Sequence, residues 1–147
     1  SAENISRLQH STRFDNLPPD IMIIYMGNND ALVQNLNTAN FEKSYRNMLN
    51  NLYTLYPNIQ LFLGTLSYEK YFVGKDYYEE HVLVTAEVNR IIQSLASEYN
   101  LPIIDFATAY SDSSYLFDTI HPNVLGMKAL ANVAIDAISK FYNPTTI

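Results

Sequence analysis

The sequence contains no cysteine and no tryptophan, and only four of its 147 residues are glycine. The lack of cysteine excludes disulfides, thiolate nucleophiles and zinc sites built on thiolates. It leaves the compartment open, because a chain without cysteine is equally suited to a secreted or a cytoplasmic location. The length predicts one domain.

Basic residues are scarce as well. Nine Lys and Arg stand against 15 Asp and Glu, which gives a formal net charge of −6. An acidic chain without a basic cluster is a poor candidate for binding nucleic acid or anionic lipid. The longest apolar runs, such as "IMIIYM", have about six residues, whereas a membrane-spanning helix needs about 18. We therefore expect neither a nucleic-acid partner nor a membrane span.

Apolar residues make up 48% of the sequence and follow two patterns in alternation. Short continuous apolar runs predict strands that are buried on both faces, and apolar residues three or four positions apart predict helices. The expected strands are 20–26, 59–66 and 101–106, and the expected helices are a short one around Ile5 and Leu8, then 40–56, 77–100 and 122–142. This alternation predicts an α/β fold with a parallel sheet and helices on both faces.

Ligands of such sheets bind beyond the carboxyl ends of the strands, and the segment "GNND" (27–30) lies at one of these ends. A second polar segment, "DTIHP" (118–122), precedes the last helix. Asp118, three residues before His121, could hydrogen-bond its ring, fix the tautomer and stabilise the imidazolium. His121 is therefore a candidate general base. Taken alone, the spacing favours a helix-capping Asp with a surface His, because Asp-x-x-His also occurs by chance.

The other two histidines, His10 and His81, fall in helical patterns without a carboxylate partner at such a spacing. We predict that both are surface residues.

Taken together, the two segments resemble motifs of the SGNH hydrolase family, also called GDSL esterases and lipases. Residues 27–30 match its Gly-x-Asn-Asp block, and residues 118–122 match its Asp-x-x-His-Pro block. The resemblance covers about residues 18–142 and implies a three-layer α/β/α fold of flavodoxin-like type. The family's sheet has about five parallel strands, of which this chain would supply the last three.

The resemblance also implies roles for individual residues in a serine esterase that cleaves small acyl esters, including carbohydrate or lipid O-acyl groups. His121 would be the general base, Asp118 would orient it, and the side-chain amide of Asn29 would donate to an oxyanion hole. Gly27 and Asp30 would support the loop. Such a mechanism requires no metal and no organic cofactor, so we expect neither.

The family's nucleophile, the serine of a Gly-Asp-Ser motif, has no match in the sequence. No glycine precedes Gly27, and none is followed by Asp-Ser. We expect residues 1–147 to be a partial SGNH domain whose nucleophile, companion glycine N–H and first strands lie on a missing N-terminal segment. That segment would be removed by proteolysis or by truncation of the expressed chain. Other serines, expected to hydrogen-bond within loops, are Ser67, Ser111, Ser113 and Ser114.

The sequence is compatible with two classes of function. One is the serine esterase, and the other is a non-catalytic α/β binding or interaction module that kept the fold. The joint presence of Asn29, Asp118 and His121 favours the enzyme. The segment 67–80 should overhang the cleft, where its aromatic side chains could contact a sugar or a short acyl chain, or instead cover the following helix.

Overall fold

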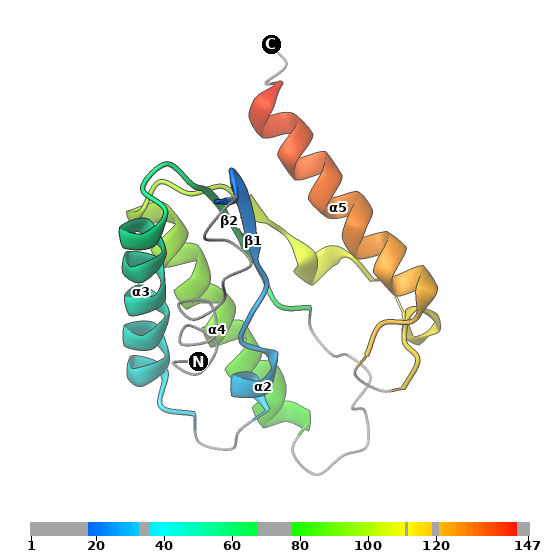
Figure 1. The fold of residues 1–147 in the computed structure, drawn as a ribbon. Coiled ribbons are helices and arrows are strands. Elements are labelled where there is room, and N and C mark those ends of the chain that lie inside the picture. Colours follow the sequence, from blue (N-terminus) through cyan, green and yellow to red (C-terminus); the bar gives the residue numbers. More distant parts are fainter. Residues whose placement is uncertain (1–17, 33–35, 68–77, 111, 119–120, 144–147) are drawn as a thin grey trace.

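A computed structural model of the chain describes residues 18–32, 36–67, 78–110, 112–118 and 121–143. The expected short helix around Ile5 and Leu8 lies outside these residues, as do His10, Ser111 and the aromatic segment 68–77. Figure 1 shows a sheet between two layers of helices, which confirms the predicted α/β class.

The sheet has three parallel strands in the order β1-β2-β3. These are β1 (Ile21–Ile24), β2 (Gln60–Gly64) and β3 (Ile103–Ile104). Ile21 pairs with Gln60, and Leu63 pairs with Ile103. All three predicted strands exist, although each is shorter than the apolar run that predicted it. The parallel order brings the three carboxyl ends to one edge of the sheet.

Helices cover the sheet on both sides (Figure 1). Helices α3 (Thr38–Leu55) and α4 (Tyr78–Glu98) lie on one side, and α5 (Val124–Tyr142) lies on the other. A single turn, α2 (Asn28–Ala31), follows β1, and two short 3₁₀ turns, η1 (Phe106–Thr108) and η2 (Ser113–Tyr115), precede α5. Among the described residues, no helix is long and apolar enough to cross a membrane.

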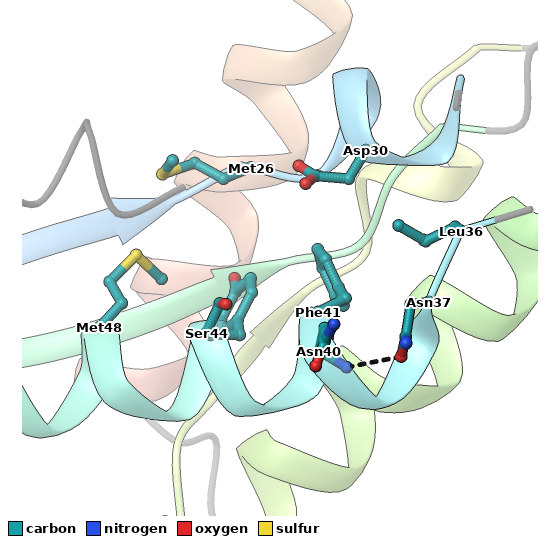
Figure 2. Close-up of a pocket in the computed structure, with 10 residues that line it drawn as sticks. Met26, Asp30, Leu36, Asn37, Asn40, Phe41, Ser44 and Met48 are labelled. Carbon is teal, nitrogen blue, oxygen red and sulfur yellow. Dashed lines mark hydrogen bonds between the residues drawn. The ribbon is translucent and has the colours of Figure 1, made fainter. Parts of the chain in front are cut away.

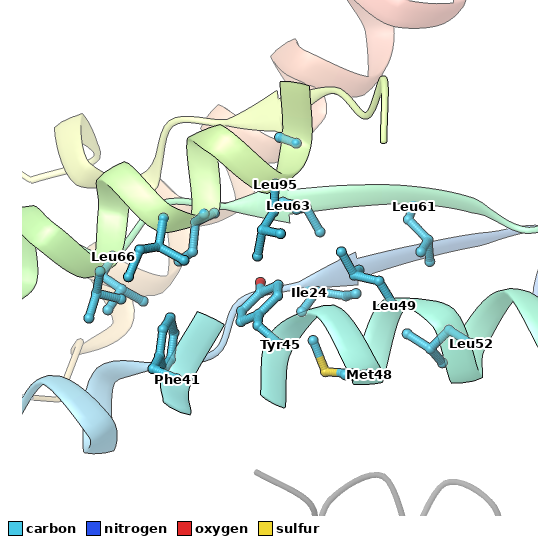
Figure 3. Close-up of a cluster of buried hydrophobic side chains, with 14 of the residues drawn as sticks. Ile24, Phe41, Tyr45, Met48, Leu49, Leu52, Leu61, Leu63, Leu66 and Leu95 are labelled. Carbon is cyan, nitrogen blue, oxygen red and sulfur yellow. The ribbon is translucent and has the colours of Figure 1, made fainter. Parts of the chain in front are cut away.

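The main core fills the space between the sheet and the helices α3 and α4 (Figure 3). Because successive strand residues point to opposite faces, Leu61 and Leu63 of β2 face these helices while Phe62 faces α5. Phe62 belongs to a smaller cluster with Ile104 and Leu130. Burial of a leucine or phenylalanine side chain contributes about 1.5–3 kcal/mol. The two clusters therefore fix both helical layers to the sheet.

Strand β1 is buried on one face only. Its Met22 and Ile24 meet the main core, whereas Ile21 and Ile23 on the opposite face are each 40% exposed. The prediction that this strand is buried on both faces is therefore wrong for the chain as described. Within the described part of the chain, β1 is also an edge strand, since β2 alone pairs with it. An edge with an exposed apolar face favours association with a further segment.

The start of α5 differs from the prediction. The helix begins at Val124 rather than at Pro122, and Asn123 is its N-cap. Pro122 lies before the cap and forms an isolated antiparallel bridge with Leu116. A proline suits the first turn of a helix because it lacks an N–H, but here a side-chain oxygen of Asn123 satisfies the first N–H groups instead.

Candidate active site

The first polar segment forms a tight turn between β1 and α2. Gly27 has φ of 126°, a conformation that residues with a Cβ rarely adopt. A Cβ at this position would also press against the side chains of Leu66, Phe41 and Val88. The turn places Asn29 on the exposed side of α2 and leaves Asp30 half-buried. Glycine thus lets the chain leave the sheet abruptly and present an amide side chain at the strand end.

The second polar segment holds its histidine through two hydrogen bonds to one carboxylate. Asp118 Oδ2 lies 2.8 Å from His121 Nδ1, and Asp118 Oδ1 accepts the backbone N–H of His121 at 2.7 Å. A carboxylate accepts only, so Nδ1 carries the proton when the ring is neutral. The imidazole is 72% exposed, and Nε2 is the nitrogen that can take a proton from another group. This contact, predicted from the motif, is present.

The loop that carries His121 is tied to α5 by Asn123. The Asn123 Oδ1 accepts the N–H groups of Leu125 and Gly126, while its Nδ2 donates to the carbonyl of Ser114 at 2.7 Å. The same Nδ2 donates to the Leu116 carbonyl at 3.2 Å. One side chain therefore caps the helix and holds η2 against its first turn.

Gly126 permits this close approach. A Cβ there would collide with the backbone carbonyl of Tyr115, which accepts the Asn123 N–H at 2.9 Å. The hydrogen bond from the Phe117 N–H to the His121 carbonyl, 2.7 Å long, closes the other end of the loop. Sequence reasoning missed both Asn123 and Gly126, although an Asn directly before an apolar helical pattern is a recognisable capping signal.

The carboxyl end of β2 is held by side chains from two other elements. Asn89 of α4 donates from Nδ2 to the Leu66 carbonyl at 2.9 Å and accepts the Leu66 N–H at 2.6 Å. The Thr65 hydroxyl donates to Asp105 at 2.8 Å. Ser67 is 8% exposed and its hydroxyl lies 3.2 Å from that of Tyr25. Ser67 is thus engaged in packing and hydrogen bonding at this strand end.

A cavity of about 240 Å³ lies between the β1–α2 turn and α3 (Figure 2). Gly27 and Asp30 line it, whereas neither Asn29 nor His121 is among its lining residues. Burial raises the pKa of Tyr45 in its wall, so that hydroxyl remains protonated. The other side chains of the wall are apolar or uncharged: Met26, Leu36, Asn37, Asn40, Phe41, Ser44 and Met48.

The structure corrects the prediction for His81. This residue is 7% exposed rather than at the surface, and its Nδ1 lies 3.0 Å from the Ala31 carbonyl oxygen. The contact could not be predicted, because it comes from α2, a turn that the sequence did not predict. The burial could have been predicted, since His81 lies seven and eleven residues before the buried Val88 and Ile92, a spacing that places it on the same face of α4. Of the predicted site residues, Gly27, Asn29 and Asp30 share one turn, and Asp118 and His121 share one loop.

Residues 2–129 match the model of the GDSL-like lipase/acylhydrolase family. No curated protein sequence is significantly similar to the chain.

Several solved structures share the fold. A GDSL-like lipase from Bacteroides thetaiotaomicron has a TM-score of 0.74 at 17% identity, over 95% of this chain and 71% of that one. A catalytic mutant of an acetylxylan esterase from Geobacillus stearothermophilus has a TM-score of 0.73 at 18% identity, over 93% and 66%. A family 3 carbohydrate esterase from Clostridium thermocellum has a TM-score of 0.67 at 20% identity, over 95% and 65%. At these identities the likeness concerns the fold alone.

Proposed function

Because the chain belongs to the GDSL-like lipase/acylhydrolase family, we propose that it is part of a serine esterase that cleaves small acyl esters. Residues 1–147 would supply the general base, its orienting carboxylate and one oxyanion donor. The nucleophilic serine would come from a segment that precedes Ser1. The observation that carries this proposal is the double hydrogen bond between Asp118 and His121.

The base would act through Nε2 of His121. With Nδ1 bonded to Asp118 Oδ2, the exposed ring presents its second nitrogen for proton transfer. His121 would take the proton of the serine hydroxyl as the serine attacks the ester carbonyl, and then return it to the leaving alcohol. Asp118 would stabilise the imidazolium formed in between. Water would cleave the resulting acyl-enzyme by the same two proton transfers.

Asn29 would stabilise the charge that develops on the carbonyl oxygen. Its position on the exposed side of α2, directly after the carboxyl end of β1, supports this role. Removal of one such donor typically lowers the rate about 10²–10³-fold. Gly27 would keep the turn narrow, and Asp30 would brace it from the side of the cavity.

The exposed features of β1 support a missing N-terminal segment. The strand has an unpaired edge within the described residues, and Ile21 and Ile23 expose apolar surface on the side of α5. A further parallel strand with its following helix would pair with that edge and cover that face. We propose that this strand carries the nucleophile at its carboxyl end, next to the turn of Gly27.

For the substrate, we propose a short O-acyl group on a carbohydrate. Two of the fold neighbours are named as an acetylxylan esterase and a carbohydrate esterase, which motivates this choice over a lipid ester. The exposed His121 loop is consistent with a large polar alcohol that remains partly in solvent. The test compares kcat/KM for acetylated xylo-oligosaccharides with kcat/KM for a medium-chain lipid ester. The higher value identifies the substrate class.

The test of the proposed function is ester hydrolysis by the full-length protein and by its His121→Ala variant. We expect turnover of a short-chain aryl ester that falls by about 10³-fold or more in the variant. We also expect no turnover by the isolated 147-residue chain, because it would lack the nucleophile and one oxyanion donor. A full-length protein without esterase activity would instead favour the non-catalytic binding module.

A further inference from the structure

A buried histidine contacts the turn that carries Asn29. His81 lies in α4, and its Nδ1 is 3.0 Å from the carbonyl oxygen of Ala31, the last residue of α2. A carbonyl oxygen only accepts hydrogen bonds, so Nδ1 of His81 is the donor and carries the proton. Because His81 is 7% exposed, water competes little for this bond.

Helix α2 cannot hold its position by itself. It has four residues, and its turn is closed by the Ala31 N–H, which bonds the Gly27 carbonyl at 2.8 Å. Isolated helices shorter than about 12–15 residues are marginal in water, so this turn depends on its neighbours. It packs against α4 through Ala31, which is 3% exposed, and Gly27 lies close to Val88 of the same helix.

The hydrogen bond from His81 restricts the orientation of α2 against α4, which apolar packing alone does not. Apolar contacts resist separation of two helices but permit small rotations and shifts, whereas a hydrogen bond to a carbonyl weakens steeply when its angle changes. The bonded carbonyl is only two residues beyond Asn29, within the same turn. Asn29 itself is exposed, so the turn that carries it sets the position of its Cα and the direction of its Cα–Cβ bond.

We propose that His81 is a positioning residue that aims the Asn29 amide at the developing oxyanion by holding the end of α2. The inference rests on the proposed function, because it gives Asn29 the role assigned there. His81 touches no reacting atom and acts through α2. An oxyanion donor works by being fixed in advance, and a displacement of about 1 Å can lower the rate by about 10²-fold.

Two substitutions separate the hydrogen bond from the bulk of the ring. His81→Asn places an amide N–H close to the position of Nδ1, whereas His81→Leu keeps an apolar side chain without a donor. In the full-length protein, we expect His81→Leu to lower kcat about tenfold or more with KM changed less than about twofold. His81→Asn should retain most of kcat. If the leucine variant does not fold, His81→Gln replaces it, because its amide lies one bond too far to donate in the same place.

Two further measurements show whether the effect passes through α2 and Asn29. In an Asn29→Ala background, His81→Leu should lower kcat little further, because the donor that it positions is already gone. Amide hydrogen exchange of residues 28–32 should be faster in His81→Leu than in the unsubstituted protein and unchanged in His81→Asn.

Equal loss of kcat in the asparagine and leucine variants, additive losses with Asn29→Ala, or unchanged exchange in α2 would each overturn the inference. A failure of the proposed function has a different signature. In that case the unsubstituted full-length protein has no esterase activity, or Asn29→Ala leaves its kcat unchanged. The positioning of Asn29 by His81 then loses its catalytic meaning, while the exchange data still decide whether His81 holds α2.

Discussion

Asp118 contacts His121 with both of its carboxylate oxygens, one on the ring Nδ1 at 2.8 Å and one on the backbone N–H at 2.7 Å. The first bond fixes the tautomer, and the second fixes the backbone from which the ring projects. The side chains are 47% and 72% exposed, so the pair contributes little to stability. Under the proposed function, this geometry would orient His121 as a base rather than support the fold.

Replacement of Asp118 by Asn should separate these contributions. We expect kcat of the full-length protein to fall about 10²–10⁴-fold, because an amide neither enforces the tautomer nor stabilises the imidazolium. The free energy of unfolding should change by less than about 1 kcal/mol. Esterase kinetics and thermal denaturation measure the two effects. As a matched control, Asp136→Asn removes another exposed carboxylate, which pairs with Lys140 on α5, and it should leave kcat unchanged.

Replacement of Asn123 by Ala should affect both stability and activity. The variant loses the cap of α5 and the hydrogen bonds to Ser114 and Leu116, so we expect a loss of about 1–2 kcal/mol in unfolding free energy. We also expect a lower kcat, since the His121 loop loses its attachment. Asn123→Asp keeps the capping oxygen but not the two donors. It should recover part of the stability without recovering kcat, and an aspartate variant with full activity would contradict this explanation.

The turn at Gly27 gives a third prediction. Gly27→Ala would require a Cβ at φ of 126° against three packed side chains, which should cost about 1–3 kcal/mol and lower kcat by moving Asn29. Asn100 also has positive φ, at 53°, but lies just beyond α4. Asn100→Ala should cost about 1 kcal/mol without any change in kcat. Chemical denaturation and kinetics of both variants distinguish strain at the site from strain elsewhere.

Sequence reasoning was accurate where a pattern was local and complete. The Asp118–His121 contact could be predicted because both residues belong to one short loop, and α3 because Phe41, Tyr45 and Leu49 repeat at helical spacing. It failed where contacts join distant segments. The hydrogen bond of His81 depends on α2, a turn of four residues whose apolar content is too low to produce a periodic signal.

The residues at which the strands end also could not be predicted from the sequence, for a similar reason. The apolar run 101–106 contains only two residues of β3, because pairing with β2 ends at Gly64 and Ile104 and the chain then turns into η1. A run of apolar residues indicates burial but not the length over which a neighbouring strand is available for hydrogen bonding. Likewise, the half-exposed face of β1 reflects what pairs with and covers the strand rather than its own sequence.

The exposed isoleucines of β1 give a fourth prediction. Ile21 and Ile23 should lie under the proposed N-terminal segment in the full-length protein and at the surface in the isolated 147-residue chain. Ile23→Thr should therefore destabilise the full-length protein by about 1–3 kcal/mol while reducing self-association of the isolated chain. Chemical denaturation measures the stability of the full-length protein and its variant. Light scattering measures self-association of the isolated chain with and without the substitution. Equal stability of the full-length protein and its variant would show that nothing covers this face.

The central claim is that the nucleophile lies before Ser1 and that His121 activates it. Reaction of the full-length protein with a fluorophosphonate, followed by peptide mass mapping, tests this claim most directly. We predict phosphonylation of one serine N-terminal to residue 1, with labelling greatly slowed in His121→Ala and absent from the isolated 147-residue chain. Stoichiometric labelling of a serine within residues 1–147, such as Ser67, that depends on His121 would contradict the claim.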